Sequence, residues 1–244
     1  MEVSLKNRII LVTGAGQGIG NELCKRLATA GCHVIAVSRS VAPLQYSALI
    51  PLLIEIETIS VDLSDWASTR TRLQHIKKVD GVVNNAGIAI IKPFEELTEE
   101  DFDKTFSVNT KAVFNVSQMM APRMPSVGGS IVNVSSLASL RSFQGHAVYS
   151  ASKAAVDSIT RSLALELGPR NIRVNSVNPT VILTRMGREN WSDPSKAKPL
   201  LDNIPLHRFG EVSEVVDTII YLLSDKSSFM TGHSLPLEGG YCAC

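Results

Sequence analysis

Short runs of aliphatic and β-branched residues alternate along the whole chain with longer segments in which apolar positions recur with helical spacing. Several of the short runs are apolar throughout, which is typical of strands buried on both faces of a parallel sheet. This alternation predicts an α/β fold, with a seven-stranded parallel sheet and helices on both of its faces. The predicted strands are Ile9–Thr13, His33–Val37, Glu57–Val61, Gly81–Asn84, Ser130–Ser135, Arg173–Asn178 and Ser234–Leu237.

The helices between these strands are expected to begin near Gly18, Ser64, Thr98, Val148 and Ser213. At Thr98 and Ser213 a hydroxyl precedes acidic residues, a pattern favoured at helix N-termini because the hydroxyl accepts from free backbone N–H groups. The stretch 181–205 lacks a clear period and contains several prolines. It is longer than an ordinary connection, and we expect it to be a substrate loop or lid.

Composition adds limits on size and on partners. The 244 residues contain no Pro- or Ser-rich linker and no shift in composition, so we expect a single domain over residues 1–244. A hydrophobic content of 44% with 19% charged residues excludes a disordered chain. The formal net charge of +1 gives no electrostatic basis for binding nucleic acid and favours a small molecule as the partner.

The sequence also favours a cytoplasmic location. No apolar run approaches the ~18 residues that a transmembrane segment needs, and the N-terminus lacks the apolar region of a signal peptide. The cysteines show no CxxC spacing and no neighbouring histidine cluster, which predicts free thiols in a reducing compartment and no metal site. They are Cys24, Cys32, Cys242 and Cys244.

A glycine-rich segment, Thr13–Gly20, joins the first predicted strand to the first predicted helix. Glycines in such a turn let backbone N–H groups and the helix N-terminus approach a pyrophosphate. The segment therefore predicts a doubly wound Rossmann fold that binds a dinucleotide. The expected cofactor contacts in this turn are Gly14, Gly16, Gln17, Gly18, Ile19 and Gly20.

The end of the second predicted strand bears on the choice of dinucleotide. A site that prefers NAD has Asp or Glu there for the ribose 2′-hydroxyl, whereas this chain has Ser38 and Arg39. A guanidinium beside hydroxyl groups suits a 2′-phosphate, so we expect NADP(H). The alternative is that Arg39 is an ordinary solvated arginine, and Lys6 and Arg8 are further candidates for the phosphate contact.

Three polar residues are expected at the carboxyl edge of the sheet, where doubly wound proteins bind ligands. Tyr149 and Lys153 are four residues apart in one predicted helix, and Ser136 follows the preceding strand. Alone, a Tyr-Lys pair at this spacing is common on solvated helices. A phenol is only about 0.1% ionised at neutral pH, and a nearby ammonium lowers its pKa. We expect Tyr149 to protonate a developing alkoxide, Lys153 to lower the phenol pKa, and Ser136 to polarise the carbonyl.

Together these motifs resemble the short-chain dehydrogenase/reductase family over essentially the whole chain. The matching positions, in family order, are Thr13–Gly20, Asn84–Gly87, Asn109, Ser136 and Tyr149–Lys153. The resemblance implies that Asn109 holds a water and a helix carbonyl in a proton relay to Lys153, and that Lys153 binds the nicotinamide ribose. Tyr149 and Lys153 thus also count as cofactor contacts. The other expected contacts are Asp62, at the adenine amino group, and Leu63, Asn85, Ala86, Gly87, Pro179, Val181 and Thr184.

One departure from the family pattern narrows the resemblance. Where the family commonly has Pro-Gly after the sixth strand, this chain has Pro179-Thr180, which resembles the branch of L-xylulose (dicarbonyl) reductases and lung carbonyl reductase. The resemblance implies NADPH-dependent reduction of small ketones, α-dicarbonyls or L-xylulose, the last to xylitol. His146 and Trp191 are then substrate contacts beside Ser136 and Tyr149; the alternative is that His146 caps its helix and Trp191 packs the lid.

Other functions remain open at this point. Within the family, a 3-oxoacyl or hydroxysteroid reductase is an alternative, and from another class, a non-catalytic dinucleotide sensor or scaffold. An apolar rim of Leu137, Leu140 and Phe143 favours small diketones or aromatic carbonyls over a polyhydroxy sugar. The resemblance also implies a homotetramer with two-fold symmetry, built on the helices from Glu99 and Val148 and on the C-terminal strand.

Overall fold

Seven parallel strands form one sheet in the computed structural model, which describes residues 4–40, 56–126, 128–184, 187–188 and 191–243. The strand order is β3-β2-β1-β4-β5-β6-β7, and every neighbouring pair runs parallel. The predicted fold class is therefore confirmed, and each predicted strand end lies within one residue of the observed end. The strands are β1 (Ile9–Thr13), β2 (His33–Ser38), β3 (Ile56–Ser60), β4 (Gly81–Asn84), β5 (Gly129–Val134), β6 (Ile172–Pro179) and β7 (Ser234–Leu237).

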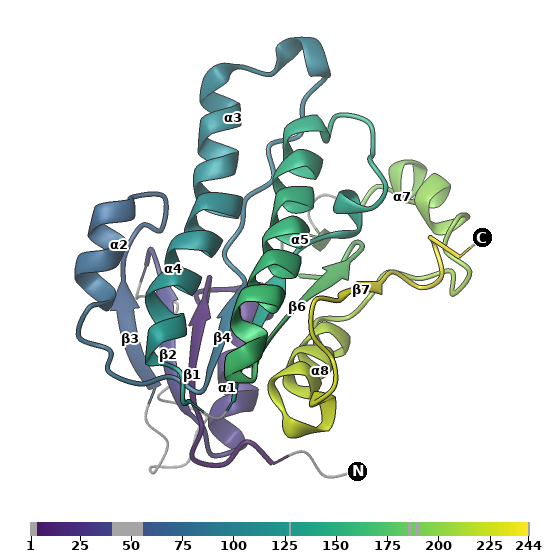
Figure 1. The fold of residues 1–244 in the computed structure, drawn as a ribbon. Coiled ribbons are helices and arrows are strands. Elements are labelled where there is room, and N and C mark those ends of the chain that lie inside the picture. Colours follow the sequence, from purple (N-terminus) through teal and green to yellow (C-terminus); the bar gives the residue numbers. More distant parts are fainter. Residues whose placement is uncertain (1–3, 41–55, 127, 185–186, 189–190, 244) are drawn as a thin grey trace.

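The winding direction of the sheet reverses between β1 and β4 (Figure 1). From β1 the chain moves outward to β2 and β3, and it then returns to the other side of β1 and continues to β7. The connections that follow β1 and β4 leave the sheet in opposite directions, which opens a crevice at their carboxyl ends. Ligands of doubly wound sheets bind in this crevice, so a ligand is expected at the segments after β1, β4 and β5.

Helices cover both faces of the sheet. α1 and α8 pack together on one face, whereas α2, α4 and α5 cover the other (Figure 1). α3 continues into α4 through the helical turn η3 (Ser107–Lys111) and lies beside α5. The helices are α1 (Gly18–Thr29), α2 (Trp66–Leu73), α3 (Glu99–Phe106), α4 (Ala112–Met120), α5 (Ala147–Leu167), α7 (Pro194–Leu201) and α8 (Val212–Leu223).

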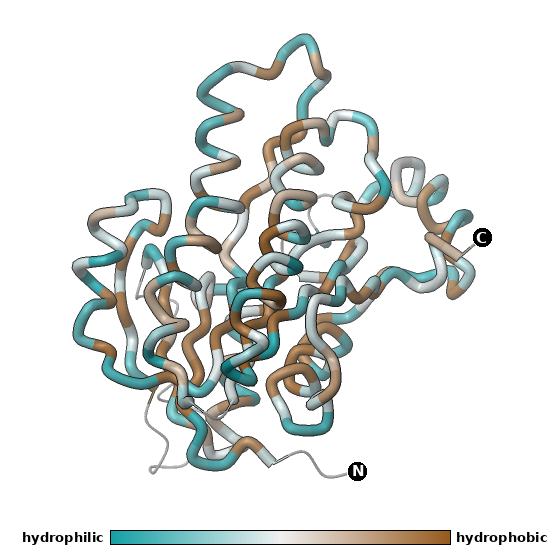
Figure 2. Tube along the Cα trace, in the orientation of Figure 1, coloured by the Kyte–Doolittle hydropathy of each residue, from teal (hydrophilic) through white to brown (hydrophobic). Residues whose placement is uncertain are grey.

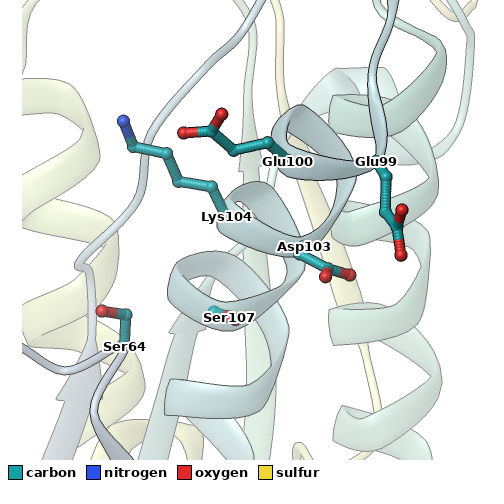
Figure 3. Close-up of a pocket in the computed structure, with 6 residues that line it drawn as sticks. All are labelled: Ser64, Glu99, Glu100, Asp103, Lys104 and Ser107. Atoms are coloured by element: carbon teal, nitrogen blue, oxygen red, sulfur yellow. The ribbon is translucent and has the colours of Figure 1, made fainter.

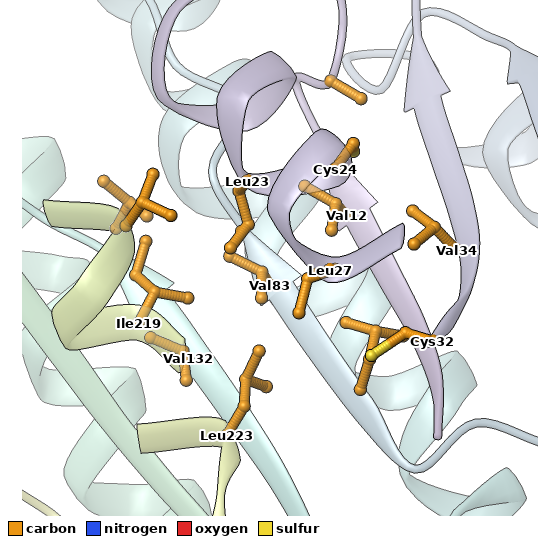
Figure 4. Packing of buried hydrophobic residues seen from close by; sticks show 14 of the residues in the cluster. Val12, Leu23, Cys24, Leu27, Cys32, Val34, Val83, Val132, Ile219 and Leu223 are labelled. Carbon is orange, nitrogen blue, oxygen red and sulfur yellow. The ribbon is translucent and has the colours of Figure 1, made fainter. Parts of the chain in front are cut away.

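The core is divided into two layers because side chains alternate along each strand. Val12 and Val132 pack towards α1 and α8, where they meet Ile219 (Figure 4). Their neighbours Leu11 and Ile131 belong to the cluster on the opposite face. Both clusters are almost wholly aliphatic, and hydrophobic residues gather in the strands of the sheet and in the helices packed on it, whereas the outer loops are hydrophilic (Figure 2). This core fixes the strand ends that carry the site.

Local structure differs from expectation at two places. Ser213 does not cap α8: the helix begins at Val212, and the Glu214 carboxylate accepts from the Glu211 backbone N–H at 2.7 Å. The expected loop 181–205 contains α7, because Asp193 caps a helix whose first residue is a proline, a position that proline tolerates. Residues 185–186 and 189–190 of that loop lie outside the described residues.

The expected cap of α3 is confirmed: Thr98 Oγ1 accepts from the Asp101 N–H, and the Asp101 carboxylate accepts from the Thr98 N–H, each at 3.2 Å. Over the described ranges, no helix combines the length and the apolar character that crossing a membrane requires. Cys24 and Cys32 are buried and Cys242 is exposed, while Cys244 lies outside the described residues.

Candidate active site

The turn between β1 and α1 requires glycine at several positions. Gly14 and Gly18 have φ angles of +67° and +57°, in the left-handed region that favours glycine. A Cβ on Gly16 would lie 2.6 Å from Ser38 Oγ, and one on Gly20 would collide with the Gly14 carbonyl oxygen. The backbone therefore forms a cradle at the N-terminus of α1, and it can hold a pyrophosphate without interference from side chains.

This turn is fastened to the segment after β4. Asn85 Nδ2 donates to the carbonyl oxygens of Thr13 and Gly14, at 3.0 and 3.2 Å. In return, Thr13 Oγ1 accepts from the backbone N–H groups of Asn85 and Ala86, at 3.0 and 3.1 Å. The sequence identified Asn85 only as a cofactor contact. In the structure its amide also bridges the segments that follow β1 and β4, a contact that no local sequence pattern reveals.

The end of β2 lies beside the glycine turn. Ser38 is half-buried against Gly16, and Arg39 is exposed, as a guanidinium that reaches a solvent-facing phosphate must be. Lys6 and Arg8 precede β1 and therefore lie at the opposite, amino edge of the sheet, where Arg8 pairs with Asp225 at 2.8 Å. Their candidacy for the 2′-phosphate contact is therefore wrong.

The segment after β3 carries the residues expected at the adenine. Asp62 Oδ1 accepts from the backbone N–H and the hydroxyl of Ser64, at 2.9 and 2.8 Å, and Leu63 is buried. A carboxylate has several lone-pair sites, so these bonds do not use the full acceptor capacity of Asp62. After β6, Thr184 approaches the glycine turn, because its Cγ2 would lie 3.3 Å from a Cβ on Gly18.

Ser136, Tyr149 and Lys153 converge at the carboxyl end of β5. Ser136 begins the short helix η5 (Leu137–Ser139), where its Oγ accepts from the Ala138 N–H at 3.1 Å, and it hydrogen-bonds with the Tyr149 side chain. Lys153 Nζ lies 5.9 Å from the centroid of the Tyr149 ring and donates to the carbonyl oxygen of Val134 at 2.8 Å. The structure thus brings together the three residues selected from the sequence.

Burial sets the protonation of these groups. It raises the pKa of Tyr149, and the hydrogen bond with Ser136 only partly opposes this. It lowers the pKa of Lys153 from 10.5 to about 8, against the opposing effect of Asp157. We expected Lys153 to give Tyr149 a lowered pKa; in the structure the shift is upward, because desolvation of the phenolate is the largest effect.

Asn109 links the site to the helices beside it. It is fully buried in the π-helical turn η3, and its Nδ2 donates to the Ile88 carbonyl oxygen at 2.9 Å and to Ser152 Oγ at 3.0 Å. Its Oδ1 accepts from the Ile88 N–H at 2.8 Å. Asn109 therefore ties the segment after β4 to α5. Gly87 lies between this amide and Lys153, because a Cβ there would be 3.3 Å from Nζ and 3.4 Å from Asn109 Oδ1.

The two expected substrate contacts have different surroundings. The His146 ring lies 6.0 Å from that of Tyr149, between it and Phe143, and makes no capping hydrogen bond to its helix. His146 is nevertheless the N-cap residue of α5, and its carbonyl oxygen accepts from the Ser150 N–H at 2.7 Å, so it caps the helix through its backbone and not through its side chain. Trp191 instead packs against Phe209, with ring centroids 5.8 Å apart, in the cluster around α7. Sequence reasoning missed Tyr241, whose ring lies 5.8 Å from that of Phe143.

A wide surface pocket of about 600 Å³ lies near α3 (Figure 3). Its lining contains the carboxylates of Glu99, Glu100 and Asp103 and a single ammonium, that of Lys104. A pyrophosphate would be repelled there. Ser64, which follows the residues expected at the adenine, also lines this pocket, whereas none of the glycines of the turn after β1 does.

Comparisons with known proteins agree with this geometry. A family model described as enoyl-(acyl carrier protein) reductase matches residues 14–242. The chain is 51% identical to an L-xylulose reductase of Mesocricetus auratus, over 99% of each chain, and 45% identical to carbonyl reductase [NADPH] 2 of Sus scrofa, over 100% of each. It is 30% identical to a structure described as a gluconate 5-dehydrogenase of Beutenbergia cavernae with bound NADP, with a TM-score of 0.89 and 99% of each chain covered.

The fold, the phosphate cradle and these similarities define an oxidoreductase that acts on CH–OH and C=O groups with a nicotinamide dinucleotide. The chain belongs to the short-chain dehydrogenase/reductase family.

The buried lysine generates a prediction about stability. Because the pKa of Lys153 in the folded chain is about 8 and its ordinary value is 10.5, the unfolded chain binds the proton more tightly between these values. The free energy of unfolding should therefore rise, relative to that of Lys153→Met, as the pH increases from about 8 towards about 10.5. Urea unfolding of both proteins across this range measures the difference. A difference that does not change with pH would contradict the prediction.

Proposed function

We propose that this protein is an NADPH-dependent carbonyl reductase that acts on small ketones, α-dicarbonyls or L-xylulose. The observation that carries the proposal is the convergence of Ser136, Tyr149 and Lys153 beside a phosphate cradle bordered by Arg39. The similarity to an L-xylulose reductase and to a carbonyl reductase named for NADPH, which extends over 99% or more of each chain, supports the substrate class and the cofactor.

Tyr149 is the proton donor in this proposal. When bound, the reduced nicotinamide supplies the hydride that reaches the carbonyl carbon. The phenol of Tyr149 gives its proton to the carbonyl oxygen, and its raised pKa keeps it in the protonated form that a donor needs. The Ser136 hydroxyl donates a hydrogen bond to the same oxygen and so stabilises the developing negative charge.

Lys153 and Asn109 support this proton transfer. The Lys153 ammonium lies close enough to the Tyr149 ring to stabilise a phenolate after the proton has left. It would also hydrogen-bond the nicotinamide ribose. Asn109 holds α5 in place through Ser152, whose hydroxyl donates to the Tyr149 carbonyl oxygen at 2.7 Å. Ser136, Tyr149 and Lys153 thus act together on the carbonyl oxygen. Asn109 orients the helix that carries the proton donor.

The substrate would enter beside His146 and the partly exposed side chain of Leu140. This mixture of a ring nitrogen and an apolar surface suits a small carbonyl compound. Tyr241 and Phe143 form the outer aromatic wall, and α7 covers the site from the side of the segment after β6.

A panel of carbonyl substrates tests the activity. We expect NADPH oxidation with L-xylulose or diacetyl, little with a steroid, and a rate at least about 1000-fold lower in Tyr149→Phe, because the proton donor is lost. NADPH binding, measured by fluorescence, should be retained in that variant. The absence of turnover with every carbonyl, despite tight NADPH binding, would favour a dinucleotide sensor instead; turnover with the steroid would favour the hydroxysteroid alternative.

Cofactor preference is tested at Arg39. Arg39→Asp replaces a charged donor with a carboxylate that repels the 2′-phosphate and can accept from a 2′-hydroxyl. The dissociation constant for NADPH should rise by about 10-fold or more while that for NADH stays the same or falls. Arg141→Asp is a control at an exposed arginine of a different segment. An unchanged preference in Arg39→Asp would refute the role of Arg39.

We further propose that residues 1–244 act as one domain in a cytoplasmic homotetramer. Large apolar side chains are exposed on several elements. They include Phe102 of α3 (46% exposed), Leu165 of α5 (81%) and Phe229 before β7 (102%). Association through these faces would remove them from water. Light scattering should give four times the mass of one chain, and a monomeric mass would contradict the proposal.

A further inference from the structure

A buried carboxylate lies directly behind the candidate active site. Asp157 is on α5, one helical turn after Lys153, and is only 4% exposed. Its oxygens lie 2.5 Å from Ser139 Oγ, 2.8 Å from Asn178 Nδ2 and 2.9 Å from Ser176 Oγ. A buried charge is strongly destabilising unless it is paired and hydrogen-bonded, so a carboxylate with this set of donors is a built feature of the site.

Two of these donors lead to the turn that carries Ser136. Asn178 Nδ2 also lies 3.3 Å from the Ser136 carbonyl oxygen. The Ser139 hydroxyl has one proton and two acceptors in reach, Asp157 Oδ2 at 2.5 Å and the Ser136 carbonyl oxygen at 2.7 Å. The carboxylate is the stronger acceptor, and the shorter distance is typical of a charge-assisted bond. Ser139 therefore donates to Asp157 and accepts from Asn178 Nδ2 at 2.8 Å, so that Asp157 and Asn178 both hold the Ser136 turn through the Ser139 hydroxyl.

The same carboxylate faces Lys153. Its negative charge opposes the effect of burial on the pKa of this lysine. Of the residues that the structure describes, Tyr149 on the same helix also faces the ammonium. Neutral groups from other elements approach it as well: the Val134 carbonyl of β5, Gly87 after β4, and the Asn109 amide of η3.

We propose that Asp157 is a positioning residue for carbonyl reduction, which holds the turn that carries Ser136 and supplies the buried negative charge beside Lys153. This inference rests on the proposed function of the site. Asp157 donates no proton to the substrate. It acts on one side through Ser139 and Asn178, and on the other side through its charge.

Asp157→Asn tests both effects, because it keeps the shape of the side chain but removes the charge and turns an amide donor towards existing donors. We expect kcat, with the best carbonyl substrate of the panel, to fall about 10- to 100-fold. The dissociation constant for NADPH should change by less than about threefold, since Asp157 lies away from the phosphate cradle. The alkaline limb of the kcat profile should move by about one unit to lower pH, because Lys153 then loses its proton more easily.

Two further variants separate position from charge. Ser158→Ala is the matched control, because Ser158 follows Asp157 on α5 but is exposed. It should keep activity within about twofold and leave the alkaline limb in place. Ser139→Ala keeps the charge but loses the link to the Ser136 turn, so kcat should fall while the limb stays. Ser139 is only half-buried, which makes this variant usable even where Asp157→Asn does not fold.

A second readout does not depend on turnover. The pH range in which Lys153 changes the free energy of unfolding is compared in the wild-type and Asp157→Asn backgrounds, each with and without Lys153→Met. In Asp157→Asn this range should begin at a lower pH. A wild type that reduces no carbonyl refutes the proposed function, whereas the stability measurement still decides the role of Asp157. Wild-type kcat in both Asp157→Asn and Ser139→Ala, with an unmoved alkaline limb and an unmoved pH range, would overturn the inference.

Discussion

The burial of one lysine is the constraint around which the site is arranged. Lys153 is 4% exposed on α5, and its ammonium lies at the carboxyl end of β5 beside the Tyr149 ring. Moving such a charge out of water is costly, so the fold must supply oxygen acceptors and a nearby anion. The Val134 carbonyl and Asp157 meet this need. A Cβ at Gly87 would lie 3.3 Å from the ammonium, so glycine leaves room for it.

The parts of the fold that local pattern determines were predictable from the sequence. The strands are apolar runs between turn signals, and their buried state leaves little freedom in where they begin and end. The turn after β1 was predictable because the left-handed φ angles at positions 14 and 18 favour glycine, and the sequence has Gly14 and Gly18 there. Tyr149 and Lys153 were predictable because helical spacing places them on one face and Ser136 follows the preceding strand at the same edge of the sheet.

The remaining features depend on contacts between distant segments. The π-helical turn around Asn109 has no sequence signal, since it arises where the amide meets Ile88 and Ser152. The upward shift in the pKa of Tyr149 follows from how fully neighbouring segments exclude water, which spacing does not reveal. In the same way, the sequence assigned the cap of α8 to the hydroxyl of Ser213. In the structure the carboxylate of Glu214 accepts from the backbone N–H of the N-cap residue, Glu211.

The π-helical turn at η3 has a consequence for the whole helical segment from α3 to α4. A π turn takes up more residues per turn than the α-helix, so the phase of the residues after it is displaced relative to those before it. α3 and α4 can therefore present their apolar stripes in different directions: α4 turns Val113 and Val116 inward, whereas α3 leaves Phe102 largely in solvent. Loss of one residue from Ser107–Lys111 would restore a regular helix and rotate one stripe against the other. The length of this turn is thus as strictly required as the amide that it carries.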